Sequence, residues 1–272
     1  MGTSFRIGSV FGITIRVHVL LLLLVALIVS RSGLPGLLLV GSLILIVLLH
    51  ELGHGLVAQS FGIRVVDITF LPFGGMARMK QIPEDSRIEG LIAVAGPAVN
   101  FLLAALTVPF LFLLDPGPTG DVLTAHAFAV QFMGINLVLG VFNLVPAFPM
   151  DGARVLRAFL ARRGDWLGAT ERTVAIGRAA AVITAVGGTL LLPAPLGCVF
   201  WGALAIWIWF SGAAELAAVR RRHSVDPVAD LFERMFGGRG GPFGAQPPRA
   251  AGPDAGPDAE SGGRPGAGPR AP

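Results

Sequence analysis

The sequence predicts an α-helical membrane protein with about six transmembrane helices and two small β-hairpins, one near the N-terminus and one between the second and third spans. Two observations support this fold class. Hydrophobic residues fill 53% of the 272 positions and charged residues only 14%, with a mean hydropathy of +0.72. The apolar residues also gather in stretches of about 20, the length that crosses a bilayer. This composition excludes an ordinary soluble globular protein.

The elements follow from the local patterns. Residues 5–17 alternate between apolar and polar, which predicts the first hairpin. Residues 61–82 contain two β-prone runs joined by a turn that includes Gly74 and Gly75, which predicts the second. The expected spans are 17–32, 34–59, 88–114, 122–145, 172–192 and 195–219. A signal peptide is the alternative for the first span, although no clear small-residue cleavage site follows it.

The composition changes near the C-terminus. We expect a membrane-embedded domain over residues 1–225 and a mostly disordered Gly/Pro/Ala-rich cytoplasmic tail over residues 226–272, because the tail lacks apolar surface to bury. The single cysteine, Cys198, excludes an intramolecular disulfide. The arginines are not interleaved with aromatic residues, so nucleic acid is not expected as a partner.

The basic residues predict the orientation in the membrane. With a cytoplasmic N-terminus, Arg31 alone would lie in the outer loops, and the C-terminus would also be cytoplasmic. The inner side would then hold 14 basic residues: Arg6, Arg16, Arg64, Arg78, Lys80, Arg87, Arg154, Arg157, Arg162, Arg163, Arg172, Arg220, Arg221 and Arg222. The chain has 20 Arg but 1 Lys and no Tyr, which hints at a GC-rich genome and hence at the inner membrane of a prokaryotic cell.

The second span ends in an H-E-x-x-H motif formed by His50, Glu51 and His54. Residues four apart lie on one helix face, so the two histidines can bind one metal ion, with Glu51 near enough to hold a water on that metal. The fourth span has the same direction and ends in a proline-rich segment that leads to Asp151. The charge-derived topology therefore brings Asp151 to the same side of the membrane, as a candidate third ligand.

These segments resemble the site-2 protease family of intramembrane zinc metalloproteases. The resemblance covers roughly residues 5–220 and rests on HELGH at 50–54, GPAVN at 96–100 and NLVPAFPMDG at 143–152. The motifs match the compact six-span form, without PDZ or nucleotide-sensing domains. Ala153 stands where many relatives have a glycine, a change expected to have little effect.

The resemblance implies a function and a site. It implies hydrolysis of peptide bonds within or near the transmembrane segments of membrane proteins, with one Zn²⁺ per chain, a transmembrane substrate and the lipid bilayer as partners. The implied residues are His50, His54 and Asp151 as zinc ligands, Glu51 as catalytic acid/base, Asn100 and Asn143 beside the site, and Gly74 and Gly75 in a substrate-presenting hairpin.

Two other functions fit parts of the pattern. One is a membrane zinc-binding protein without protease activity, such as a metal transporter. The other is a metalloprotease in which a glutamate is the third ligand, for which Glu171 and Glu215 are the candidates near the inner membrane face.

Overall fold

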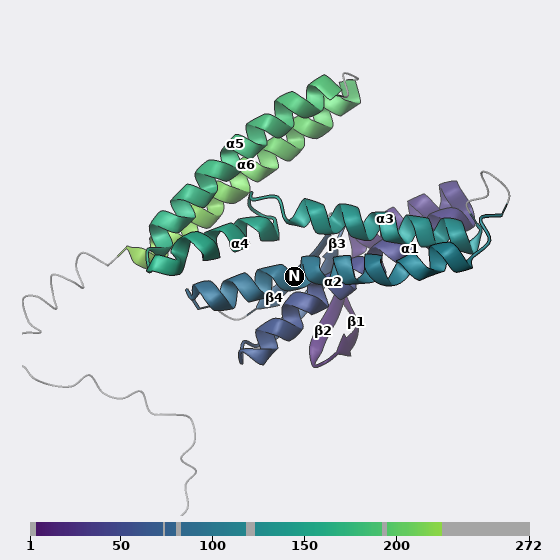
Figure 1. Ribbon diagram of the computed structural model, residues 1–272, viewed down its shortest axis with the longest axis horizontal. Coiled ribbons are helices and arrows are strands. Elements are labelled where there is room, and N and C mark those ends of the chain that lie inside the picture. Colours follow the sequence, from purple (N-terminus) through teal and green to yellow (C-terminus); the bar gives the residue numbers. More distant parts are fainter. Residues whose placement is uncertain (1–3, 73, 80–82, 118–122, 192–194, 225–272) are drawn as a thin grey trace, which may run out of the picture. The chain divides into compact units, whose positions relative to one another are not determined.

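The computed structural model describes residues 4–72, 74–79, 83–117, 123–191 and 195–224 (Figure 1). In chain order the elements are β1 (Ser4–Val10), β2 (Ile13–His18), α1 (Val19–Ser60), β3 (Val65–Leu71), β4 (Gly74–Met79), α2 (Ser86–Leu113), α3 (Ala125–Asn143), α4 (Asp151–Leu160), a 3-10 turn (Ala161–Arg163), α5 (Trp166–Leu191) and α6 (Pro195–His223). The tail predicted over residues 226–272 lies outside the described residues.

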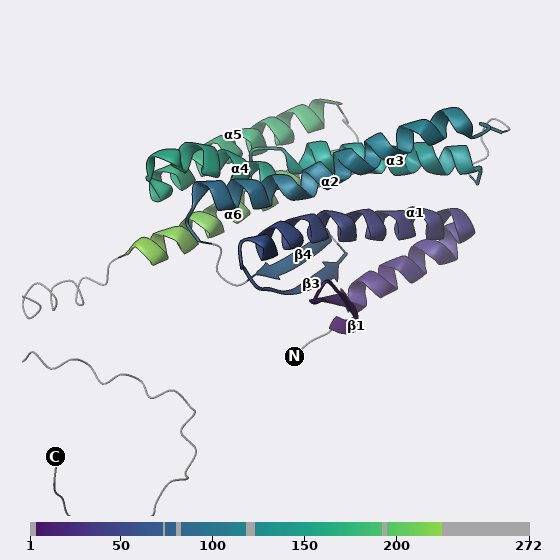
Figure 2. The same ribbon diagram turned by 60° about the horizontal axis from the view of Figure 1, so that its bottom comes forward.

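Among the described residues, five helices are long and apolar enough to cross a bilayer, namely α1, α2, α3, α5 and α6. Helix α1 has 42 residues and contains the second predicted span and all of the first except residues 17 and 18, which end β2. It bends at Gly33, whose φ of 57° and ψ of −138° are not helical, and Pro35 follows two residues later. Figure 2 shows the two arms of α1 meeting at this bend. The structure thus confirms a mostly helical fold with apolar spans. The described residues form five such helices where six spans were predicted, because α1 combines two of the predicted spans.

The other predicted spans lie in α2, α3, α5 and α6, with boundaries that differ by a few residues. Helix α2 begins where the Asp85 side chain accepts hydrogen bonds of 2.8 Å from the amides of Arg87 and Ile88. Helices α1, α3 and α4 all pack against α2. Helix α2 is therefore the central helix, in contact with each of these three.

Helix α4 lies between the fourth and fifth predicted spans, where no helix was predicted from the sequence. It has 10 residues and buries Gly152, Ala153, Arg157 and Ala158. It is too short and too polar to be recognised as a membrane span. Arg157, one of the 14 basic residues assigned to the inner side of the membrane, has only 3% of its surface exposed.

The two predicted hairpins are present, but they form one four-stranded sheet in the order β1-β2-β3-β4. Strands β1 and β2 are antiparallel, as are β3 and β4, whereas β2 and β3 pair in parallel from Thr14 opposite Asp67 to Val17 opposite Phe70. A parallel pair needs a long crossover, and α1 supplies it. Ile13, Ile15 and Ile68 pack in the core between the sheet and α1.

An ion pair fixes the register of β3 and β4. The Asp67 side chain is 3% exposed, and Arg78 on β4 donates to it through Nε at 2.8 Å and also through Nη2. These hydrogen bonds from Arg78 hold the pKa of Asp67 below its usual value of 3.8, although burial acts in the opposite direction. The pair therefore holds β4 in place on the sheet.

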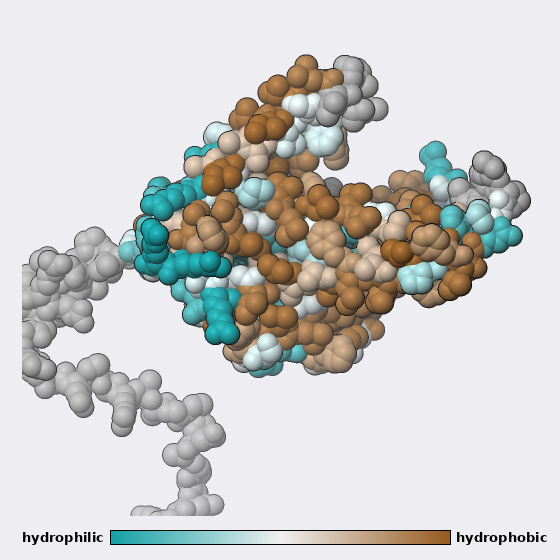
Figure 3. Space-filling model, viewed as in Figure 1, coloured by the Kyte–Doolittle hydropathy of each residue, from teal (hydrophilic) through white to brown (hydrophobic). Residues whose placement is uncertain are grey.

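The surface of the helices is strongly apolar. Figure 3 shows hydrophobic residues over the middle of the helical region and hydrophilic residues at its two ends. Large apolar side chains are more than half exposed on every long helix, among them Leu23, Phe112, Val138, Ile183 and Phe210. Surfaces of this extent are unusual in soluble monomers and match a lipid environment.

Candidate metal centre

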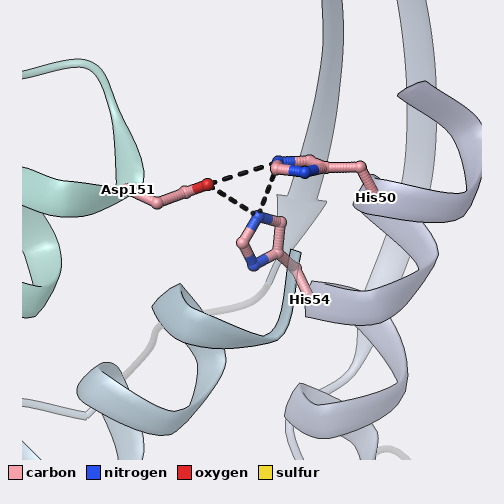
Figure 4. Close-up of side chains that lie close together, drawn as sticks. All are labelled: His50, His54 and Asp151. Carbon is pink, nitrogen blue, oxygen red and sulfur yellow. Dashed lines mark hydrogen bonds and ion pairs between the residues drawn. The ribbon is translucent and has the colours of Figure 1, made fainter. Parts of the chain in front are cut away.

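Two histidines and an aspartate converge at the C-terminal half of α1 (Figure 4). His50 and His54 lie one turn apart, are both buried, and have their Nε2 atoms 3.1 Å apart. Asp151, the first residue of α4, places Oδ2 3.2 Å from His50 Nε2 and 3.1 Å from His54 Nε2. Within the described part of the chain, these three side chains can hold one metal ion together.

Helix α2 sets the orientation of both imidazoles. His54 Nδ1 lies 2.6 Å from the carbonyl oxygen of Ile92, and His50 Nδ1 lies 2.9 Å from Oδ1 of Asn100. An oxygen of this kind accepts a hydrogen bond, so each Nδ1 carries the proton and donates. In a neutral imidazole the other nitrogen, Nε2, then carries a lone pair.

The converging atoms therefore need a cation. Two Nε2 lone pairs and a carboxylate oxygen face one another within 3.2 Å, an arrangement that is repulsive without a positive charge between them. Two imidazoles and one carboxylate form the ligand set of catalytic zinc sites, in which the fourth position stays open to water. The residues present thus fit Zn²⁺.

Gly96 allows α2 to approach the imidazoles. A Cβ on this residue would overlap His54 Nε2 and lie 2.7 Å from His50 Cε1. The G-P-A-V-N motif was noted in the sequence for Asn100, but the steric role of its glycine becomes visible only once α1 and α2 are packed together.

The side chain of Glu51, on the ligand helix α1, faces β4, which is an edge strand of the sheet. A Cβ on Gly75 would be 2.7 Å from Glu51 Cγ and 3.0 Å from Val47 Cγ1, so the strand contacts the glutamate closely. The backbone of Ala77 on β4 also lies close to the Glu51 carboxylate. Gly74, at the start of the strand, has a φ of 136°, which favours glycine.

The two asparagines differ in their positions. Asn100 is fully buried and contacts His50, and its Nδ2 has no hydrogen-bond partner in the described structure. Asn143 is half-buried and donates from Nδ2 to the carbonyl oxygen of Leu139, 3.0 Å away in its own helix. The structure thus brings Asn100 to the ligands and shows Asn143 bonded within α3.

Both alternative glutamates bind arginines. Glu171 pairs with Arg220 at 2.7 Å, and Glu215 accepts a 2.7 Å hydrogen bond from Arg157. Neither belongs to the group of side chains that can share a metal ion.

Sequence reasoning missed the buried pair formed by Arg157 and Glu89. One signal was available. Glu89 falls inside the predicted third span, and an acidic side chain in an apolar span needs a partner.

The chain resembles known proteins over most of its described length. A family model, that of peptidase family M50, matches residues 38–129 and 119–186. A zinc metalloprotease of Methanocaldococcus jannaschii is 34% identical over 194 residues, which cover 70% of this chain and 55% of that protein. Stage IV sporulation protein FB of Bacillus subtilis is 27% identical over 224 residues, covering 82% of this chain and 72% of that protein.

A solved structure agrees with these sequence matches. The site-2 protease from Methanocaldococcus jannaschii superimposes with a TM-score of 0.57 and 31% identity, covering 78% of this chain and 95% of that one. The chain spans about half the length of the archaeal zinc metalloprotease that it matches. These findings confirm the resemblance drawn from the motifs: the chain belongs to peptidase family M50, the site-2 protease family.

Proposed function

We propose that this protein is an intramembrane zinc metalloprotease that hydrolyses peptide bonds within or near the transmembrane segments of other proteins. The observation that carries the proposal is the convergence of His50 Nε2, His54 Nε2 and Asp151 Oδ2 within 3.2 Å. Glu51 lies on the same helix, next to these ligands and next to an edge strand. The family and its zinc metalloprotease members support one Zn²⁺ per chain.

His50, His54 and Asp151 would hold the zinc, and Asn100 would keep His50 in its binding tautomer. Zinc bound there would lower the pKa of a coordinated water to about 7 and polarise the substrate carbonyl. Glu51 takes the proton of the attacking water and delivers it to the leaving amine. Asn143, which is half-buried at the end of α3, donates one Nδ2 hydrogen to Leu139 and would have the second available for the developing oxyanion of a substrate.

The β3–β4 hairpin would present the substrate. A transmembrane helix hides its amides in its own hydrogen bonds, and unpaired backbone groups in lipid cost several kcal/mol each. Strand β4 lies at the edge of the sheet and touches Glu51, with Gly75 allowing the close contact. An unwound substrate segment that pairs with β4 satisfies its backbone groups and reaches Glu51.

The proposed topology has six crossings, because each arm of α1 crosses the bilayer on its own side of the bend at Gly33. The distribution of basic residues favours cytoplasmic N- and C-termini. The hydrophilic ends and apolar middle in Figure 3 support a position across the bilayer. The Arg-rich composition favours a prokaryotic source, for which the proposed location is the inner membrane.

Replacing the third ligand tests the zinc site. The purified parent is expected to contain about one zinc per chain, and Asp151→Asn should lose most of it because a neutral amide is a poor zinc ligand. Metal analysis of the detergent-purified proteins measures this. Asp115→Asn, an exposed aspartate outside the site, is the matched control and should keep its zinc. Full zinc content in Asp151→Asn would move the third ligand elsewhere.

Gly96→Ala tests the same site from the side of α2. The added methyl overlaps His54 Nε2, so zinc binding should be lost or strongly weakened. Gly134→Ala, also in a helix, meets nothing within 4 Å and should bind zinc like the parent. Chelator competition measures both affinities. Equal affinities for the two variants would show that α2 does not approach the imidazoles as described.

Glu51→Gln separates chemistry from metal binding. Glutamine keeps the size of the side chain beside Gly75 but does not accept a proton, so cleavage should fall about 10²–10⁴-fold while the zinc stays bound. Cleavage of a model transmembrane substrate and metal analysis give the two readouts, with Glu171→Gln as the control. If Glu51→Gln cleaved at the parent rate, Glu51 would not be the acid/base.

Proline substitutions test substrate presentation by β4. Ala77 and Met79 lie two residues apart, so their amides point to the same side of the strand, and the Ala77 backbone faces Glu51. Ala77→Pro and Met79→Pro remove amides from the free edge and should slow cleavage without loss of zinc.

Ala77→Val and Met79→Leu keep the amides and serve as controls with near-parental cleavage. Met79→Pro leaves the Ala77 backbone next to Glu51 unchanged. Slower cleavage by this variant would therefore report loss of the strand edge and not a disturbance of Glu51. Parental cleavage by both proline variants would count against strand addition.

A further inference from the structure

A buried ion cluster joins three helices away from the ligands. Arg157 on α4 donates from Nε to Glu89 Oε2 at 3.0 Å, from Nη2 to Glu89 Oε1, and from Nη1 to Glu215 Oε1 at 2.7 Å. The side chains of Arg157 and Glu89 are each 3% exposed, whereas that of Glu215 is 25% exposed. The pair with Glu89, on α2, is therefore the fully buried part of the cluster.

Both members of this pair lie next to elements that hold the zinc ligands. The Arg157 guanidinium carbon is 5.1 Å from the centre of the Phe148 ring, and buried Phe148 precedes Asp151 by three residues. Glu89 lies about one helical turn before Ile92, whose carbonyl oxygen orients His54. The pair thus links the chain segment before the third ligand to the helix that orients the second.

The metal site requires such a link. His50 and His54 come from α1 and Asp151 comes from α4, and both helices pack against α2. The position of α4 on α2 therefore sets the distance from Asp151 Oδ2 to the imidazoles. Apolar packing alone tolerates small shifts, whereas a two-pronged guanidinium–carboxylate pair fixes direction as well as distance. Metal ligands tolerate deviations of only about 0.2 Å.

We propose that Arg157 is a positioning residue for the third zinc ligand. Its two-pronged pair with Glu89 and its contact with Phe148 fix Asp151 at binding distance from His50 and His54. This inference rests on the proposed zinc site. Replacing a buried ion pair by apolar side chains of similar size often changes the stability of a protein little. Such a replacement can therefore show whether the pair positions Asp151 without also unfolding α4.

The test is the double variant Glu89→Leu/Arg157→Met, which removes both fully buried charges together. Glu215, whose side chain is 25% exposed, loses Arg157 but keeps the favourable field of Arg154 and Arg222. We expect a thermal unfolding midpoint of the metal-free protein close to that of the parent, and a zinc affinity lower by about 10–100-fold, as for other groups that orient metal ligands. The Co²⁺-loaded variant should also show an altered visible absorption spectrum, because the cobalt loses or reorients a carboxylate ligand.

Glu215→Gln is the matched control, because it removes only the charge of the partly exposed partner on α6 and leaves the buried pair with Glu89 intact. Its zinc affinity should stay within about fivefold of the parent, because the pair of Arg157 with Glu89 still holds α4 on α2. Arg157→Lys gives a second measurement if the double variant does not fold. It keeps the charge and loses the two-pronged geometry, so its zinc affinity should also fall.

The outcomes are distinct. Parental zinc affinity and an unchanged Co²⁺ spectrum in the double variant, or in Arg157→Lys if only that variant folds, would overturn the positioning role while the zinc site stands. A folded parent that binds neither zinc nor cobalt would overturn the proposed function together with this inference.

Discussion

Two imidazole nitrogens and a carboxylate oxygen meet within 3.2 Å in the interior of an apolar helical protein, an arrangement that a shared metal cation stabilises. Helix α1 supplies two of these atoms directly, because His50 and His54 are one turn apart. The third has to come from a different part of the chain. Much of the remaining structure consequently serves to hold Asp151, at the start of α4, opposite two histidines that are about 100 residues away.

Helix α2 meets this requirement along a single face. Glu89, Ile92, Gly96 and Asn100 are spaced by three or four residues, so they lie in one line along the helix. Glu89 binds Arg157 on α4, and the Ile92 carbonyl orients His54. Gly96 leaves space for both imidazoles, and Asn100 orients His50. One helix therefore aligns ligands from two others.

The parts of this site differ in how far the sequence predicts them. His50 and His54 follow from a four-residue spacing within one helix, whereas the approach of Asp151 depended on charge-derived topology and on family motifs. The contacts of Gly96 and Arg157 arise between helices, which local periodicity does not describe. The same reason explains why the hairpins were predicted but the single sheet was not. Each hairpin is local, whereas the parallel pairing of β2 with β3 joins strands on either side of the 42-residue α1.

That parallel pairing has a functional consequence under the proposed mechanism. Because α1 is the crossover between β2 and β3, the helix that carries Glu51 also lies against the sheet whose edge is β4. Binding at a strand edge uses backbone groups, which all sequences share. Recognition of a substrate then depends less on its side chains than on the free energy needed to unwind its helix near Glu51. Segments with helix-weakening residues, such as glycine, would therefore enter the site more readily than uniformly stable helices.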